Sequence, residues 1–279
     1  MTAMTTEFDR SLAKVLVLEG GFVNDPDDPG GATNKGVTQA VYDTYRKSVG
    51  AGRQSVRLIS DDELRAIYKT RYWDLVKGDQ LPTGVGYVVF DGGVNSGPGQ
   101  SVKWLQRALG LAKVDGLVGP ETLAAVNAVD DHDALIAKII ALRDAFLHAL
   151  KGWKKFGKGW ASRIKQVLAV GQAWARGSVG PEVVYDAAGA RKALPSDAKA
   201  APSAAIADAA TGGGLITGST VLGTLQSAQA QLAPFASGST VVTNIVAGIV
   251  VVSAVLVIGG AIYGWWARRR RAELAEALA

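Results

Sequence analysis

A run of turn-forming residues directly after a helix constrains this chain most strongly. Apolar residues recur at helical spacing from Phe8 to Val15, with Thr5 or Thr6 as a suitable cap. The double glycine at residues 20–21 then ends the helix, because glycine readily takes the left-handed conformation there. Residues 24–34 are dense in Asp, Pro and Gly, which favour turns. The pattern predicts a helix followed by a small β-hairpin or an ordered loop.

The rest of the first 176 residues has a mainly helical pattern. Thr38 is a suitable N-cap, and Ser60 with Glu63 forms a capping-box signature. Further helical patterns follow the apolar stretch of residues 84–91 and continue to Trp174. We therefore predict a mainly α, two-lobed helical domain, with a first lobe over residues 1–83 and a second lobe over residues 84–176.

Composition changes after Arg176. Ala, Ser, Pro, Gly and Asp dominate residues 186–210, and we predict a flexible linker over residues 177–211. Residues 212–236 are weakly apolar and are a candidate for a second membrane helix.

Residues 245–267 contain no charged residue. As a helix they extend about 34 Å, enough to cross a hydrocarbon core of about 30 Å. Aromatic residues lie at the end of this stretch and four consecutive arginines follow it, as is typical of a membrane interface: Tyr263, Trp265, Trp266 and Arg268 to Arg271. We predict a transmembrane helix over residues 241–267 with a basic cytoplasmic tail over residues 268–279; a buried core helix is the alternative. The lipid bilayer would then be a partner, with the chain a single-pass inner-membrane protein whose N-terminal domain acts in the periplasm.

The titratable composition excludes several kinds of site. The chain has no cysteine, which excludes disulfides and thiolate metal sites, and its two histidines, His132 and His148, do not suggest a metal centre. We predict no metal and no cofactor. The net charge of +5 favours anionic partners. No nucleic-acid-binding motif is present, so we predict no nucleic-acid partner. Residues 151–165 combine lysines with aromatic residues. We interpret the tryptophans, Trp153 and Trp160, as core residues and the lysines as a solvated face, in preference to a binding site for an anionic polymer.

Glu19 is the candidate catalytic acid. It falls on the same helical stripe as Phe8 and Val15, and it lies at the helix C-terminus, where the macrodipole disfavours an anion. Both effects favour a protonated carboxyl, which glycosidic bond cleavage requires of its proton donor. The alternative is that Glu19 only caps a loop or pairs with Lys35. The aspartates at residues 25–28 offer a second carboxylate, or serve only the turns.

Two segments carry a resemblance to known proteins. The segment from Glu19 to Gln39 begins Glu-Gly-Gly-Phe-Val-Asn-Asp-Pro. It resembles the N-terminal part of glycoside hydrolase family 108, a family of phage and bacterial muramidases. The segment from Phe90 to Pro120 resembles the predicted peptidoglycan domain that accompanies this family. The resemblance spans roughly residues 8–175. It implies a lysozyme-like fold, cleavage of the β-1,4 bond between N-acetylmuramic acid and N-acetylglucosamine, and Glu19 as the catalytic acid.

A looser resemblance to phage lysozymes suggests the remaining roles. Those enzymes space Glu, Asp and Thr by eight and five residues; Glu19 and Asp28 fit, whereas Thr33 follows Asp28 after four. Asn95-Ser96-Gly97 is similar to their Asn-x-Gly turn. The predicted catalytic residues are Glu19, Asp28 and Thr33. The predicted substrate-binding residues are Gly20, Gly21, Asn24, Gln39, Asn95 and Gln106. For Asn95 and Gln106, a helix cap and an exposed amide are equally good interpretations.

We therefore predict an endolysin-type peptidoglycan hydrolase tethered to the inner membrane, with peptidoglycan as its substrate and no particular lysis protein indicated as a partner. The alternative is a non-catalytic, membrane-anchored peptidoglycan-binding or holin-like lysis protein, in which the Glu19 region is only a scaffold.

Overall fold

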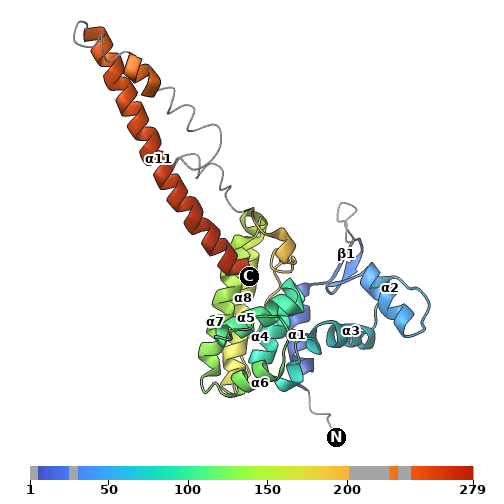
Figure 1. Cartoon of the computed structure of the whole chain (residues 1–279). Coiled ribbons are helices and arrows are strands. Elements are labelled where there is room, and N and C mark those ends of the chain that lie inside the picture. Colours follow the sequence, from blue (N-terminus) through green and yellow to red (C-terminus); the bar gives the residue numbers. More distant parts are fainter. Residues whose placement is uncertain (1–5, 25–30, 201–225, 232–239, 279) are drawn as a thin grey trace. The chain divides into compact units, whose positions relative to one another are not determined.

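The computed structural model describes residues 6–24, 31–200, 226–231 and 240–278 (Figure 1). The chain divides into two compact units, residues 1–199 with 277–279 and residues 200–276. In the residues described, the first unit is mainly helical with one small sheet, so the prediction of a mainly α domain with a small β element, of the kind found in lysozymes, is confirmed.

Helix α1 (Glu7–Glu19) ends at the candidate catalytic residue. Its N-cap is Thr6, whose hydroxyl accepts a hydrogen bond from the Asp9 amide at 3.1 Å. Its buried face carries Phe8, Leu12, Val15, Leu18 and Glu19. Gly20 then takes a φ of +76°, which glycine adopts without steric cost. The predicted helix and its glycine stop are therefore confirmed.

Three short antiparallel strands follow α1, in the order β1-β2-β3. Their bounds are β1 (Phe22–Val23), β2 (Thr33–Asn34) and β3 (Val37–Thr38). Lys35 and Gly36 connect β2 to β3, and both have positive φ, +47° and +76°. Two residues of positive φ form the tight turn that matches the twist of a hairpin, so this turn holds its backbone in one place beside the end of α1.

The rest of the first lobe consists of short helices (Figure 1). They are α2 (Gln39–Ser48), the 3-10 turn η1 (Val56–Leu58), α3 (Asp61–Tyr68), the π turn η2 (Lys69–Trp73) and the 3-10 turn η3 (Gly78–Gln80). Thr38 caps α2, and the predicted capping box of Ser60 and Glu63 begins α3. The rings of Phe8 and Trp73 pack 5.4 Å apart and join α1 to this lobe.

Five helices form the second lobe, drawn from turquoise through green to yellow in Figure 1. They are α4 (Val85–Ser96), α5 (Pro98–Ala108), α6 (Pro120–Asn127), α7 (His132–Ala149) and α8 (Trp153–Ala175). Every residue of α4 is buried, and α5, α7 and α8 pack around it. The start of α4 approaches α8 so closely that a Cβ at Gly84 would meet the Gly171 carbonyl oxygen. This close packing places polar residues of α4, α7 and α8 inside the core.

Residues 178–199, which we call the strap, run from α8 back over the second lobe. They include the 3-10 turn η4 (Pro195–Asp197). The Lys199 amide donates to the Ala149 carbonyl at 2.9 Å, and Ala198 pairs with Leu150. The composition predicted a flexible linker over residues 177–211. Residues 178–199 of this stretch lie against the helices, and residues 201–211 lie outside the described residues.

Helix α11 (Thr240–Leu278) covers the predicted membrane helix and most of the basic tail. It continues through the arginines, where Arg269 and Arg270 both pair with Glu273 at 3.1 Å. No helix in the described part of the chain is long and apolar enough to cross a membrane. The predicted transmembrane helix over residues 241–267, and with it the single-pass inner-membrane localisation, is therefore wrong. The second candidate, residues 212–236, lies outside the described residues except for residues 226–231.

Candidate active site

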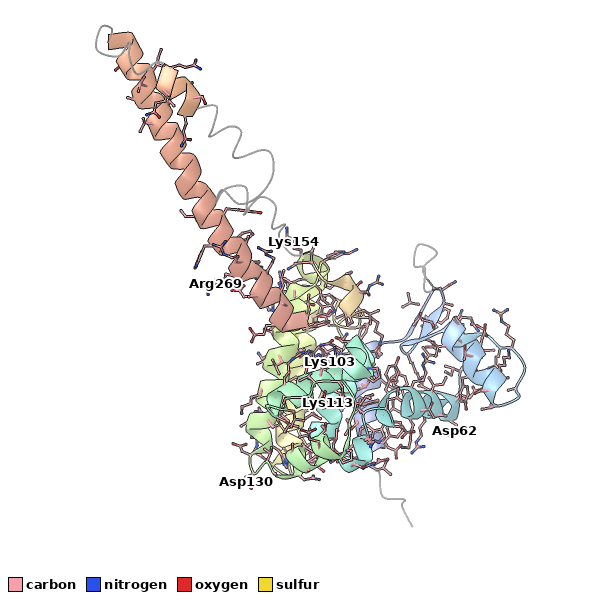
Figure 2. The ribbon with its side chains drawn as sticks, in the orientation of Figure 1. Asp62, Lys103, Lys113, Asp130, Lys154 and Arg269 are labelled. Atoms are coloured by element: carbon pink, nitrogen blue, oxygen red, sulfur yellow. The ribbon has the colours of Figure 1, made fainter. Side chains whose placement is uncertain are left out.

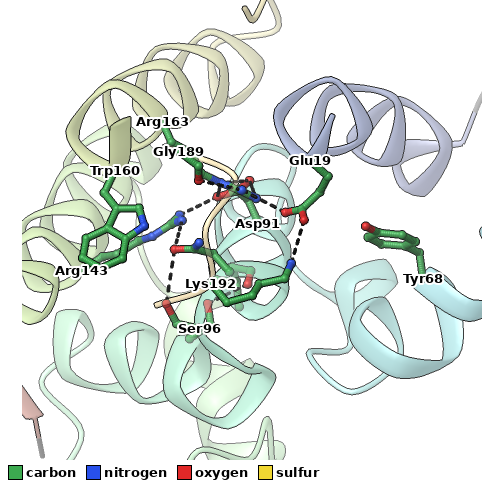
Figure 3. A network of polar contacts seen from close by, with 12 residues as sticks. Glu19, Tyr68, Asp91, Ser96, Arg143, Trp160, Arg163, Gly189 and Lys192 are labelled. Atoms are coloured by element: carbon green, nitrogen blue, oxygen red, sulfur yellow. Dashed lines mark hydrogen bonds and ion pairs between the residues drawn. The ribbon is translucent and has the colours of Figure 1, made fainter. Parts of the chain in front are cut away.

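Glu19 ends α1 as a buried carboxylate whose side chain is only 2% exposed. Its Oε1 accepts a hydrogen bond from Arg163 Nη1 at 2.9 Å, and its Oε2 accepts one from Lys192 Nζ at 2.8 Å (Figure 3). Lys35, the partner considered from sequence, pairs with Asp61 instead, at 3.1 Å. The apolar stripe is present along α1, but the carboxylate itself meets two cations, which the spacing argument did not anticipate.

Arg163 on α8 joins Glu19 to Asp91 on α4. Its Nε and Nη2 donate to Asp91 Oδ2 at 3.1 and 2.8 Å, while its Nη1 reaches Glu19. Arg143 on α7 donates to Asp91 Oδ1 at 2.6 Å. Burial opposes the ionisation of Asp91, but the two guanidinium groups outweigh burial and hold the pKa of Asp91 below its ordinary value. Asp91 is therefore a charged anchor for the arginine that holds Glu19.

The same balance keeps Arg163 charged. Burial alone disfavours its cation, yet the charges of Asp91 and Glu19 raise the pKa of Arg163 above the ordinary value. The planar guanidinium can serve both carboxylates at once because its donors point in fixed directions. Arg163 therefore fixes the position of Glu19 Oε1 relative to the core of the second lobe.

Tyr68 lies on the other side of Glu19 (Figure 3), and the backbone of Gly36 packs against both side chains. The Tyr68 hydroxyl donates to the Lys35 carbonyl at 2.8 Å. Burial, and then the negative charge of Glu19, raise the pKa of Tyr68 well above its ordinary value. A Cβ at Gly36 would lie 2.6 Å from Glu19 Oε2. Glycine at this turn thus lets the backbone pack directly against the carboxylate.

The predicted residues near Glu19 in sequence have different environments. Gly21 and Asn24 are exposed, whereas Gly20 lies beneath the Tyr185 ring of the strap. Thr33 lies in β2, and its hydroxyl donates to the Gly31 carbonyl at 3.3 Å. Asp28 lies outside the described residues.

Gln39 and Gln106 use their amides within the protein. Gln39 Nε2 donates to the Gln54 carbonyl at 2.8 Å. Gln106 is 2% exposed; its Nε2 donates to Asp115 Oδ1 at 2.8 Å and its Oε1 accepts from the Gly116 amide at 2.9 Å. Gln106 is thus neither in contact with Glu19 nor an exposed amide, and it holds the loop between α5 and α6.

Asn95 is buried inside α4 and does not cap a helix. Its Oδ1 accepts from Arg143 Nη2 at 3.2 Å, and its Nδ2 donates to the Arg191 carbonyl of the strap at 3.1 Å. Asn95 therefore belongs to the polar network behind Glu19 and also contacts the strap.

Sequence reasoning missed Asp91, Arg143, Arg163 and Lys192. Two signals were present. Asp91 is a lone carboxylate at the end of an apolar run, and Arg163 follows Trp160 by three residues and so shares its helix face. In the structure Trp160 is 2% exposed, whereas the neighbouring lysines 151, 154, 155 and 158 are exposed. The predicted division into core tryptophans and solvated lysines is right for Trp160 and these lysines, whereas Trp153 is only partly buried and Arg163 belongs with the core.

Comparison with known proteins relates this arrangement to a family. Residues 12–97 match the family model described as Glycosyl hydrolase 108, and residues 100–165 match the model described as Predicted Peptidoglycan domain. The solved structure of Brucella abortus SagA is 37% identical, with a TM-score of 0.54, and the match covers 61% of this chain and 95% of SagA. The chain belongs to the glycosyl hydrolase 108 family. No curated protein matches it.

The candidate site of this glycosyl hydrolase 108 member draws on both matched regions. Glu19 and Asp91 lie in the glycosyl hydrolase match, and Arg143 and Arg163 lie in the peptidoglycan-domain match. The two matches together support a hydrolase that acts on peptidoglycan. Lys192 lies beyond both matches.

Proposed function

We propose that this hydrolase is a muramidase, which cleaves the β-1,4 bond between N-acetylmuramic acid and N-acetylglucosamine with Glu19 as the general acid. The observation that carries the proposal is the placement of Glu19. It is a buried carboxyl at the end of α1, held by a second-lobe arginine, and after Gly20 the chain continues with exposed backbone at Gly21. Glycoside hydrolysis needs such a fixed carboxyl to protonate the leaving oxygen.

The two oxygens of Glu19 have different roles in this proposal. Oε1 is held by Arg163, which Asp91 anchors in turn, so the carboxyl cannot rotate freely. Oε2 faces Lys192, whose side chain is 33% exposed and can be displaced. We assign proton donation to Oε2, with the glycosidic oxygen of the substrate taking the place of Lys192. Positioning of this kind contributes to catalysis because the donor is already oriented before the bond breaks.

The remaining site residues belong to the proposal on sequence grounds. Asp28 is the proposed second catalytic carboxylate. Thr33, which lies on β2, is the third proposed catalytic residue. The exposed residues Gly21 and Asn24, with Gly20, are proposed to contact the sugar backbone. The internal hydrogen bonds of Gln39, Asn95 and Gln106 favour structural roles for their amides. The first lobe, residues 1–83, would supply the chemistry, and the second lobe, residues 84–176, would bind the polymer.

Substitution of Glu19 by Gln tests the proposal against the alternative, a non-catalytic peptidoglycan-binding protein. We expect Glu19→Gln to abolish the release of reducing ends from purified peptidoglycan, because an amide cannot donate a proton as an acid does. Glu121→Gln, an exposed glutamate on α6, is the matched control and should keep full activity. Thermal unfolding of both variants checks that the fold survives. Cleavage by Glu19→Gln, or no cleavage by the wild type, would refute the proposal.

Product analysis tests the reaction type. A muramidase leaves a reducing N-acetylmuramic acid end, whereas a lytic transglycosylase leaves an anhydro-sugar end that is lighter by one water. Mass spectrometry of the released fragments separates the two, and anhydro ends as the main product would contradict hydrolysis.

A further inference from the structure

The strap covers the side of Glu19 that the proposed reaction must leave open. Lys192 Nζ of the strap donates a hydrogen bond to Glu19 Oε2 at 2.8 Å (Figure 3). The Tyr185 ring lies over Gly20, where a Cβ would come within 2.8 Å of the Tyr185 hydroxyl oxygen. Two strap side chains therefore lie where a sugar chain would have to approach the proposed acid.

The strap is fitted to the helices beneath it. The Val184 amide donates to Gln166 Oε1 at 2.6 Å, and the Ala193 amide donates to the Asn95 carbonyl at 3.0 Å. The Arg191 carbonyl accepts from Trp160 Nε1 at 2.8 Å. At Gly159 the fit is tightest, since a Cβ there would lie 2.5 Å from the Ala188 carbonyl carbon. These contacts give the strap a defined docked position.

Few apolar contacts hold the strap in that position. Val183 and Ala193 are buried, but most of its larger apolar side chains are exposed: Val179 by 84%, Val184 by 69%, Tyr185 by 46% and Leu194 by 42%. Segments with little apolar burial open more readily than the core. The strap is therefore held more by hydrogen bonds than by apolar burial, which makes it easier to release than the helices that it covers.

Lys192 is not required to balance the charge of the site. The carboxylates of Glu19 and Asp91 already face the guanidinium groups of Arg163 and Arg143, all within the core. Lys192 adds a third cation, and unlike the arginines it is partly exposed. The ion pair can therefore break without leaving an unpaired charge in the core.

We propose that the strap is an autoinhibitory segment: docked, it blocks Glu19 with Lys192 and covers Gly20 with Tyr185, and undocking opens the site to peptidoglycan. This inference rests on the proposed function of Glu19. Minor states of proteins are commonly populated at about 0.1–10%. If only that open fraction cleaves, complete release raises the initial rate by about tenfold or more.

Two variants of the full chain release the strap in different ways. Lys192→Gln removes the ion pair to Glu19. Gly159→Ala places a methyl group against the strap backbone, at a helix position where alanine is favoured. Lys154→Gln, at an exposed lysine on the same helix (Figure 2), is the control. We expect both release variants to free reducing ends from purified peptidoglycan at least about tenfold faster than the wild type, and the control to match the wild type.

Hydrogen exchange gives a readout that does not depend on activity. The amides of Val184 and Ala193 should exchange faster in both release variants, while those of α4 stay protected. If Lys192→Gln cleaves no faster than the wild type, and Glu19→Gln abolishes cleavage, autoinhibition is overturned while the muramidase proposal stands. If strap amides exchange faster but neither wild type nor release variants cleave, the muramidase proposal itself fails.

Discussion

Arg163→Met should destabilise the protein strongly, because it removes one cation from two buried carboxylates. Arg163 is 1% exposed, and its guanidinium serves both Asp91 and Glu19. Methionine keeps much of the aliphatic volume but no donor. Asp91 then retains only Arg143, and Glu19 only Lys192. Breaking a buried ion pair from one side costs about 3–5 kcal/mol, so we expect a loss of that size in the free energy of unfolding.

Urea unfolding of the full chain, followed by tryptophan fluorescence, measures this loss. The buried indoles of Trp73, Trp104 and Trp160 report on the helical core. With a denaturant dependence of about 1–3 kcal/mol per molar, the midpoint should fall by more than about 1 M. The matched control is Arg176→Met, where the arginine side chain is 57% exposed and pairs with Asp133. Exposed pairs contribute about 0–1 kcal/mol, so the control should unfold almost as the wild type does.

Two further variants show whether the loss comes from charge. Arg163→Lys keeps a cation but cannot donate to both carboxylates in the fork geometry, so we expect an intermediate loss of about 1–3 kcal/mol. In Asp91→Asn combined with Arg163→Met the direct ion pair between these two side chains is lost only once, so the double variant should be more stable than the sum of the single effects predicts. The reasoning is refuted if Arg163→Met costs no more than Arg176→Met, or if the coupling stays under about 0.5 kcal/mol.

Three other predictions follow from the fold. Burial opposes ionisation of Glu63, but hydrogen bonds from Ser60, Tyr42 and Arg46 lower its pKa to about 2. The contribution of the ionised Glu63 to stability is therefore complete when the pH is above the ordinary pKa of 4.5, and it is lost as the pH falls toward 2. In thermal unfolding, Glu63→Gln should flatten the dependence of the unfolding temperature on pH in this range. Gln106→Leu should cost about 1–3 kcal/mol, because it leaves the Gly116 amide without its partner. Gly84→Ala should cost more than about 1 kcal/mol, since φ there is +82° and the methyl group would meet Gly171.

Each of these predictions has an internal comparison. Identical pH profiles for the wild type and Glu63→Gln would contradict the first. For the second, Gln100→Leu is the control, because Gln100 is 6% exposed and its Nε2 has no hydrogen-bond partner in the described structure. If Gln106→Leu and Gln100→Leu lose equal amounts of stability, the unpaired Gly116 amide is not the cause of the loss. For the third, Gly110→Ala has a similar φ of +73° and open space around the added Cβ, so a larger loss at Gly84 isolates the contact with Gly171.

Local features were predicted well because their causes lie within a few residues. The cap at Thr6, the glycine stop after Glu19, the capping box at Ser60 and the short β element all depend on near neighbours in the chain. Composition was a weaker guide over longer stretches. The segment poor in large apolar residues gave a linker prediction, yet residues 178–199 dock through hydrogen bonds from backbone groups, which composition does not record. The absence of charge over residues 245–267 favoured a membrane helix, which the described structure contradicts.

The sequence by itself determined where Glu19 lies along the chain, that it ends a helix, and that turns follow it. The periodicity of apolar residues and the backbone freedom of glycine are enough for that. Only the tertiary structure decided what Glu19 contacts. Arg163 is separated from it by 144 residues and Lys192 by 173, so their meeting depends on how α1, α8 and the strap pack. Because a carboxylate takes its orientation and its access to substrate from such partners, the chemistry of Glu19 depends on packing between distant segments rather than on the stripe of its own helix.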